Sequence, residues 1–145
     1  MKKLFMFLAV SAGLPLSIAL ASRTGANEKV KRKVDLIEQS LIDSGYRVRW
    51  IIISERRSKF VNSLLPNSVK NSQHLIGNAI DVHVFDINGD GTFNKKDVDI
   101  VKKHNRLVEK AHPELKGAFG TYLNTLTSYH TIHFDTRGRS VEYNK

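Results

Sequence analysis

Apolar and polar positions recur along the chain with helical and strand periods, and this pattern predicts a small α+β domain. Three segments have helical character: 28–44, 58–65 and 97–111. Four segments have the alternating or continuous apolar pattern of strands: 47–53, 80–85, 117–122 and 131–135. Gly45 and Pro113 end the first and the last of the helices. We expect a small antiparallel sheet with helices packed against it.

The first 21 residues have the pattern of an export signal. Two lysines precede an apolar run from Leu4 to Ala21, which ends in an Ala-Leu-Ala sequence of the kind that a signal peptidase reads. Pro15 interrupts this run, and its 18 residues are few for the alternative, a retained membrane anchor. Both interpretations place the domain in the periplasm or the extracellular cell wall. The expected parts are a signal peptide at 1–21, a flexible linker at 22–27 and one domain at 28–145.

The net charge and the absence of cysteine limit the kinds of molecule that the protein is expected to bind. The 145 residues carry a formal net charge of +9, and removal of the predicted signal, with its two lysines and no acidic residue, leaves +7. A basic exported protein meets anionic cell-wall polymers and lipid headgroups, whereas nucleic-acid binding has only the charge in its favour. The chain has no cysteine, which excludes disulfides and lipoprotein attachment. Lys31, Arg32 and Lys33 lie off the apolar stripe of the first helix, so we expect a solvated face there.

Candidate metal ligands occur in one short segment before and within the second strand. The segment reads Ser72-Gln73-His74-Leu75-Ile76-Gly77-Asn78-Ala79-Ile80-Asp81. Its imidazole and its carboxylate lie seven positions apart, and zinc takes both kinds of ligand. A single His and Asp at this spacing, taken by themselves, are weak support for a metal site. The surrounding pattern, Ser-x-His-x-x-Gly-x-Ala-x-Asp with a strand that continues from the Asp, is more specific.

This pattern resembles that of the zinc peptidases of bacterial cell walls. They include D-alanyl-D-alanine carboxypeptidases and L-alanyl-D-glutamate endopeptidases, among them VanY-like enzymes and phage endolysins. An upstream Ile-Ser-Gly-Tyr-Arg-Ser segment of that family corresponds here to Ile53-Ser54-Glu55-Arg56-Arg57-Ser58. A downstream His-x-Asp-x-Arg-Gly segment corresponds to His133-Phe134-Asp135-Thr136-Arg137-Gly138. The resemblance covers residues 45–138 and implies the fold of hedgehog and D-Ala-D-Ala peptidases, with a zinc cleft on the sheet.

The resemblance implies three protein ligands to zinc: His74, Asp81 and His133. Three ligands leave a fourth tetrahedral position for water, as catalytic zinc requires. Zinc lowers the pKa of that water toward about 7 and polarises the scissile carbonyl. Arg57 is expected to grip a substrate carboxylate or to stabilise the developing oxyanion, and Arg56 takes this place if the alignment is shifted by one. Ser72 is expected to be a further substrate contact.

The general base is the point at which the chain departs from the family pattern. Relatives place Glu or Asp three residues before the last ligand, or His two residues before it. This chain has His130 three before and Thr131 two before. An imidazole can transfer the proton, since its ordinary pKa is about 6.5, so His130 is the first candidate. His83 and Asp135 are alternatives that could instead orient a ligand, and loss of activity with a retained fold is also open.

A second metal is predicted by residues 86–97, which match an EF-hand loop. The expected calcium ligands are Asp86, Asn88, Asp90, the backbone of Thr92, Asn94 and Asp97. Gly91 occupies the sharp turn, and Phe93 occupies the apolar position that packs inward. The last ligand is Asp rather than Glu, as in dockerin-like loops, so weaker binding is expected. The alternative is a solvent loop rich in Asp, Asn and Gly.

Together these residues predict an exported zinc metallopeptidase, a hydrolase of peptidoglycan stem peptides whose activity calcium modulates. They do not separate a carboxypeptidase from an endopeptidase. The alternative is a catalytically inactive, calcium-stabilised protein that binds the cell wall or has a structural role. We expect a monomer that contacts the membrane only through residues 1–21.

Overall fold

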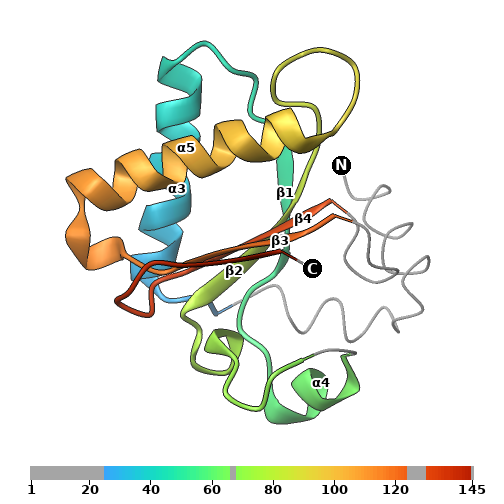
Figure 1. Cartoon of the computed structure of the whole chain (residues 1–145). Coiled ribbons are helices and arrows are strands. Elements are labelled where there is room, and N and C mark those ends of the chain that lie inside the picture. The colour runs from blue at the N-terminus through green and yellow to red at the C-terminus, as the bar shows by residue number, and fades with distance from the viewer. Residues whose placement is uncertain (1–24, 66–67, 124–129, 145) are drawn as a thin grey trace.

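The computed structural model describes residues 25–65, 68–123 and 130–144 (Figure 1). The predicted signal peptide and the first part of the predicted linker lie outside the described residues. Within the described part of the chain, no helix is both long and apolar enough to cross a membrane. The predicted domain, in contrast, is described over most of its length.

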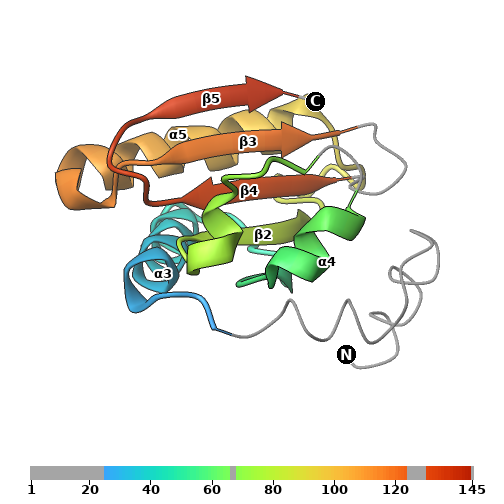
Figure 2. The ribbon, with the colours of Figure 1, turned by 90° about the horizontal axis from the view of Figure 1, so that it is seen from below.

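Five strands form one mixed sheet in the order β1-β2-β4-β3-β5 (Figure 2). Their bounds are Trp50–Ser54 (β1), Ala79–Val84 (β2), Ala118–Tyr122 (β3), Thr131–Asp135 (β4) and Val141–Asn144 (β5). The pairs β1–β2, β2–β4 and β4–β3 are antiparallel, whereas the pair β3–β5 is parallel. The prediction of a wholly antiparallel sheet is therefore wrong at this edge, although the α+β class is confirmed.

The parallel edge follows from the short connection between β4 and β5. Because β4 runs against β3, it ends beside the start of β3. Gly138 N donates to Lys116 O and Val141 N donates to Gly117 O, so the chain crosses the start of β3 and then follows it in the same direction. The four residues of β5 carry too little alternation to predict a strand.

Helices α3 (Glu28–Asp43) and α5 (Lys95–Ala111) cover one face of the sheet (Figures 1 and 2). Helix α4 (Lys59–Leu64) and the 3-10 helix η1 (Gln73–Ile76) lie on the other side, and a second 3-10 helix, η2 (Pro113–Leu115), follows α5. The three predicted helices and the four predicted strands are confirmed, with small shifts at their ends. The largest shift is that of β1, which begins at Trp50.

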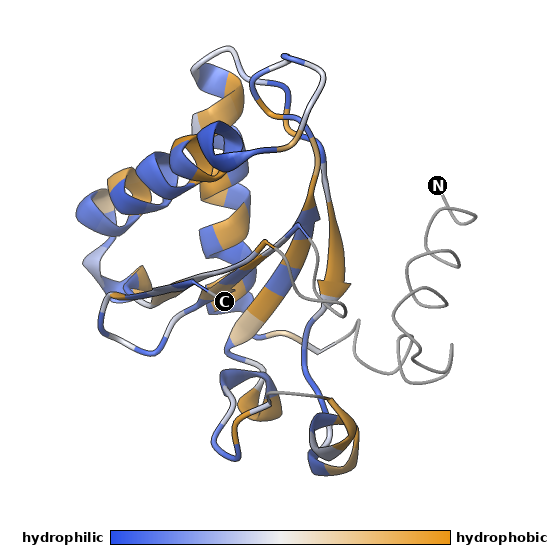
Figure 3. Cartoon of the chain, turned by 45° about the vertical axis from the view of Figure 1, so that its right-hand side comes forward, coloured by the Kyte–Doolittle hydropathy of each residue, from blue (hydrophilic) through white to orange (hydrophobic). Residues whose placement is uncertain are grey.

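Alternation along β2 assigns the two faces of the sheet. Ile80 and Val82 belong to the same buried core as the apolar residues of α3 and α5. Asp81 and His83 point to the opposite side, because successive side chains of a strand alternate. Figure 3 shows hydrophobic and hydrophilic residues in turn along the strand that follows η1. The sheet therefore separates an apolar core from a polar face, and the candidate ligands lie on the polar face.

The prediction of a solvated face on α3 is wrong at Lys33, whose side chain is 0% exposed. Its ammonium donates to Glu109 Oε1 of α5 at 2.7 Å and to the backbone carbonyl of Asp135 at 2.9 Å. Burial lowers the pKa of Lys33, and Glu109 opposes this shift. Glu109 also accepts hydrogen bonds from Gly117 N and Ser140 Oγ. The buried pair therefore joins the two helices to the end of β4.

Candidate metal centre

The three predicted zinc ligands meet on the polar face of the sheet. The register places Asp81 of β2 directly opposite His133 of β4, and η1, which precedes β2, brings His74 beside them. One possible ligand atom from each residue lies within 4.8 Å of the others, and all three residues are buried. Over the described residues, no other group of three or more His, Asp or Glu side chains is close enough to share an ion. The fold thus brings together side chains that lie far apart in the sequence.

Hydrogen bonds behind the two imidazoles decide which ring nitrogens face the centre. His74 Nδ1 lies 2.5 Å from the backbone carbonyl of Glu55, and His133 Nε2 lies 3.1 Å from Asp135 Oδ2. Both partners are acceptors, so these two nitrogens carry the protons. His74 Nε2 and His133 Nδ1 then direct their lone pairs toward Asp81 Oδ1, at 3.1 and 2.7 Å. Outer partners of this kind orient metal-binding imidazoles in proteins.

The atoms that face the centre need a positive charge between them. His74 Nε2 and His133 Nδ1 are 3.3 Å apart, and both face the same carboxylate oxygen. Lone pairs so close together repel each other unless a proton or a metal ion lies among them. Two nitrogens and one oxygen are ligands that zinc prefers, and they leave one tetrahedral position for a further ligand. The residues present therefore fit a zinc ion.

The pKa values show how the cluster is held without a metal. Burial lowers the pKa of His74. Burial also acts on His133, but its hydrogen bonds to Asp135 and Asp81 outweigh it and raise the pKa. Burial disfavours the charged form of Asp81, yet His74 and His133 hold the pKa of this carboxyl well below its usual range. Both shifts favour a proton on His133 beside an ionised Asp81 when no metal is bound.

We expect zinc affinity to fall as the pH is lowered from about 8 to about 5. Zinc needs the lone pair of His133 Nδ1, and a proton competes well for it because the pKa of His133 is raised. Below that pKa the apparent Kd for zinc should rise about tenfold per pH unit, and above it the Kd should level off. Competition with a zinc-binding dye at a series of pH values measures this. A Kd that stays constant over the range contradicts the expectation.

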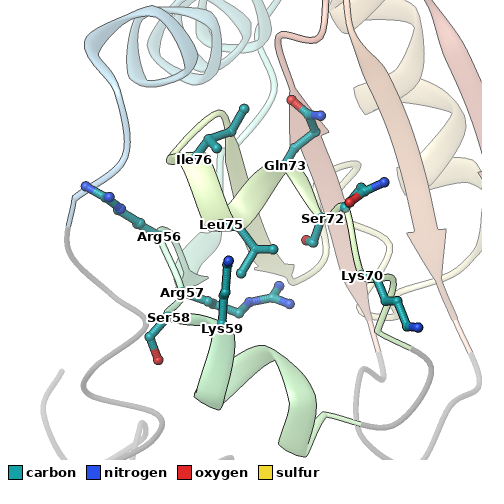
Figure 4. A pocket seen from close by; sticks show the side chains of 10 residues that line it. Arg56, Arg57, Ser58, Lys59, Lys70, Ser72, Gln73, Leu75 and Ile76 are labelled. Atoms are coloured by element: carbon teal, nitrogen blue, oxygen red, sulfur yellow. The ribbon is translucent and has the colours of Figure 1, made fainter.

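Arg57 completes the cluster from the loop that follows β1. Its Nη2 donates to Asp81 Oδ2 at 2.6 Å and its Nε donates to Ser54 Oγ at 2.8 Å, while its backbone N–H donates to His74 O at 3.0 Å. The guanidinium thus holds the Asp81 oxygen that the imidazoles do not contact. The side chain of Arg56 is directed to the opposite side from that of Arg57 (Figure 4). The structure therefore places Arg57, rather than Arg56, at the centre.

Asp135, one alternative for the general base, is buried behind His133. Its Oδ2 accepts hydrogen bonds from His133 Nε2 and Arg137 Nε, and its Oδ1 accepts one from Ala118 N. Burial disfavours the charged form, but these bonds lower the pKa of Asp135. This geometry suits the other role considered for Asp135, which is to orient His133.

His130, the first candidate for the general base, packs beside His83 and Phe93. Its ring centroid lies 4.1 Å from that of Phe93 and 5.7 Å from that of His83. His83 is two residues beyond Asp81 on the same face of β2. Burial and the nearby His83 lower the pKa of His130. The structure thus groups the two candidate imidazoles with a residue of the predicted calcium loop, on the face of β2 that also carries Asp81.

Sequence reasoning missed the aromatic residue that borders the cluster from β5. The ring centroid of Tyr143 lies 5.9 Å from that of His133. Its ring covers Gly120, where a Cβ would come within 2.2 Å of it, and its hydroxyl accepts a hydrogen bond from Tyr122. Burial raises the pKa of Tyr143. A glycine inside a strand marks a close approach of this kind, so Gly120 is the one signal for it in the sequence.

The predicted calcium loop forms a turn whose side chains bind its own backbone. Asp86 accepts hydrogen bonds from Gly89 N at 2.7 Å and Gly91 N at 2.8 Å. Asp90 accepts one from Thr92 N at 3.0 Å. Gly91 has a φ of +89°, a conformation that favours glycine and that the sharp turn requires. The expected turn is therefore present, with its carboxylates engaged within the loop.

Asp97, the last predicted calcium ligand, closes this loop. It is fully buried; its Oδ1 accepts hydrogen bonds from Ile87 N and Asn88 N, and its Oδ2 accepts one from Asn94 N. With Asn94 it forms the capping box that begins α5. Asp97 thus has a structural role in the loop. Its contact with calcium stays a prediction, as do those of the other expected ligands: Asp86, Asn88, Asp90, Thr92 and Asn94.

Comparisons with known proteins find no relative. No protein-family model matches the chain, and neither a curated protein nor a solved structure is significantly similar to it. The class is therefore defined by the fold and the site alone. They describe a small α+β domain with a mixed sheet, whose polar face carries a buried His-Asp-His cluster with the donor set of a zinc site.

Proposed function

We propose that the protein is an exported zinc metallopeptidase that hydrolyses peptide bonds in peptidoglycan stem peptides. The observation that carries the proposal is the His74–Asp81–His133 cluster, whose rings are held by outer acceptors so that their lone pairs face one carboxylate oxygen. Three ligands with one open position are typical of catalytic rather than structural zinc. Bound zinc supplies an activated water and a polarised carbonyl. The motif resemblance around His74 and His133 supports the choice of substrate.

Arg57 is proposed to act through its position and its charge. Because its Nη2 and Nε hold Asp81 and Ser54, the guanidinium stays fixed beside the cluster, and its side chain is only 11% exposed. A fixed positive charge at this place stabilises negative charge that develops on a substrate oxygen. The arginine therefore orients Asp81 and prepares the site for an anion.

Proton transfer is assigned to His130, as the sequence predicted, with His83 as the alternative. The lowered pKa of His130 keeps its ring neutral, and so able to accept a proton, at neutral pH. Its stack on His83 connects it to the face of β2 that carries Asp81. Asp135 is not proposed for this step, because donors occupy both of its oxygens.

Digestion of purified peptidoglycan tests the proposed function. The zinc-loaded protein should release muropeptides with new termini, detected by mass spectrometry, and a chelator should stop the release until zinc is restored. The mass of the products also separates a carboxypeptidase from an endopeptidase. Intact stem peptides after prolonged incubation with fully zinc-loaded protein would contradict the proposal.

The second candidate function is wall binding without catalysis. The observation that favours it is that a histidine, His130, stands where the family pattern has Glu or Asp, and that its ring packs against Phe93 and His83. Under this alternative the zinc-loaded protein sediments with purified peptidoglycan and leaves every stem peptide uncut. Sedimentation and digestion of the same sample therefore separate the two functions.

Replacing Arg57 with lysine should lower kcat/KM on a stem peptide about a hundredfold while zinc stays bound. An ammonium cannot hold Asp81 Oδ2 and Ser54 Oγ together as the planar guanidinium does. The matched control is Arg56→Lys, at the neighbouring position that points away, and it should keep full activity. Equal activity of Arg57→Lys and the wild type, or damage by Arg56→Lys alone, contradicts the assigned role.

Calcium should raise both the melting temperature and the activity. Asp86, Asp90 and Asp97 lie within twelve residues, but in this structure their carboxylates bind the loop backbone and do not meet, so calcium must draw them together. A cation bound only by the folded state stabilises that state by about 2.7 kcal/mol at a hundredfold excess over Kd. Phe93 of this loop packs on His130, so order in the loop should reach the site. Calorimetric titration with a parallel digestion assay measures both effects. Asp90→Ala should abolish both effects, whereas the control Asp35→Ala, at an exposed position of α3, should keep them. The absence of binding heat up to millimolar calcium would contradict the predicted calcium site.

A further inference from the structure

A pocket of about 710 Å³ opens beside the metal centre, between α4 and η1 (Figure 4). Arg57 lines this pocket and also holds Asp81, while Ser72 lines it and accepts a hydrogen bond from His74 N. The bond from Arg57 N to His74 O joins the two walls. A group bound in the pocket therefore lies next to the proposed zinc ligands.

The pocket is lined by four basic residues and by no acidic one. The basic residues are Arg56, Arg57, Lys59 and Lys70. Figure 4 shows Arg57 and Lys59 directed into the space between α4 and η1, whereas Arg56 and Lys70 are directed outward. No salt bridge to Lys59 is found among the described residues, whereas basic residues of α5 pair with Glu142 of β5. Lys59 thus offers a positive charge that no described carboxylate neutralises, close to the guanidinium that holds Asp81.

The pocket also has an apolar side. Leu75 and Ile76 of η1 line it, and Ile76 is 57% exposed. A small aliphatic side chain can cover this surface while an anionic group reaches Lys59. The combination fits a short peptide that carries both small aliphatic residues and a carboxylate.

We propose that this pocket binds a second carboxylate of the substrate, on a residue next to the scissile bond, and that Lys59 recognises it. This inference rests on the proposed function, because it names the substrate of that same site. Arg57 serves the bond under attack, and Lys59 adds a second positive charge on the adjacent wall. A peptide with a neutral carboxamide in place of the carboxylate loses this contact. The pocket thus selects stem peptides with a free side-chain carboxylate over amidated ones.

Equilibrium binding of two matched peptides tests the inference without reference to turnover. The peptides are an uncleavable stem-peptide analogue with a free side-chain carboxylate and the same analogue with a carboxamide. Calorimetry at low salt, where charge contacts are least screened, should give the zinc-loaded wild type about a five- to tenfold preference for the carboxylate. Lys59→Gln should remove most of this preference and retain its zinc. The matched control Lys103→Gln, an exposed lysine of α5, should keep both.

The possible outcomes separate this inference from the proposed function. Equal affinity of the wild type for the two peptides, or an undiminished preference in Lys59→Gln, overturns the inference whether or not peptidoglycan is cleaved. A Lys59-dependent preference supports it even if digestion fails and the proposed catalysis falls. Competition with inorganic phosphate and with free acetate provides a further check. If the two anions displace the carboxylate peptide equally well at equal concentration, the pocket is an unselective anion site, and that also overturns the inference.

Discussion

Replacing Asp81 with alanine is expected to weaken zinc binding by at least about a hundredfold and to leave a less stable protein. Asp81 is the residue that all the others in the cluster contact. One oxygen faces His74 and His133, and the other accepts from Arg57 at 2.6 Å. Its removal leaves two lone pairs without a shared partner and a mostly buried guanidinium without its counter-charge.

The loss of stability follows from the Arg57 side chain, which is 11% exposed. Removal of one partner of a buried ion pair costs about 3–5 kcal/mol, since the remaining charge stays desolvated. Urea unfolding of metal-free Asp81→Ala and wild type measures this cost separately from the stabilisation that zinc adds. The control His83→Ala changes a buried residue on the same face of β2 and should keep the zinc affinity of the wild type. Unchanged zinc affinity in Asp81→Ala contradicts the account of the cluster.

Replacing Lys33 with methionine should lower the free energy of unfolding by about 3–5 kcal/mol. The ammonium is 0% exposed and joins Glu109 of α5 to the backbone of Asp135, so methionine leaves the Glu109 carboxylate buried without a charged partner. The double variant Lys33→Met/Glu109→Gln should recover most of the loss, because the amide oxygen still accepts from Gly117 N and the amide NH2 can donate to the Ser140 hydroxyl, which turns to accept.

Lys31, two residues earlier and with a side chain that is 40% exposed, provides the matched control. It pairs with Glu28 on the surface of α3, and such pairs contribute at most about 1 kcal/mol. Urea unfolding of Lys31→Met, Lys33→Met and the double variant therefore tests burial rather than charge. A loss of less than about 1 kcal/mol in Lys33→Met would show that the buried pair is not needed for the fold.

The local parts of the fold could be predicted from the sequence because they depend on neighbouring residues. The alternation at 80–84 predicts a strand, and it also places Asp81 and His83 on one face. Gly45 and Pro113 stop the helical patterns, and so locate the ends of α3 and α5 within a few positions. The pairing of Asp81 with His133 is different, because 51 residues separate them and no periodicity reports a register. Only the motif resemblance suggested that these side chains meet.

The features that the sequence did not predict have a physical reason in common: each depends on an interaction with a residue far away in the chain. Helical spacing placed Lys33 off the apolar stripe, but its long side chain reaches a carboxylate on α5 and a carbonyl on β4. Strand β5 has four residues and depends on β3 for its pairing. The carbonyl of Glu55 orients His74 through the backbone, and a pattern of side chains carries no trace of it.

The most direct test of the account is the zinc content of the purified protein. The domain is produced in zinc-supplemented medium, dialysed against zinc-free buffer and analysed by plasma mass spectrometry, together with Asp81→Ala and His83→Ala. The account predicts one zinc ion per chain in the wild type and in His83→Ala, and almost none in Asp81→Ala. Wild-type protein that is folded but holds no zinc, or Asp81→Ala that retains a full equivalent, would contradict it.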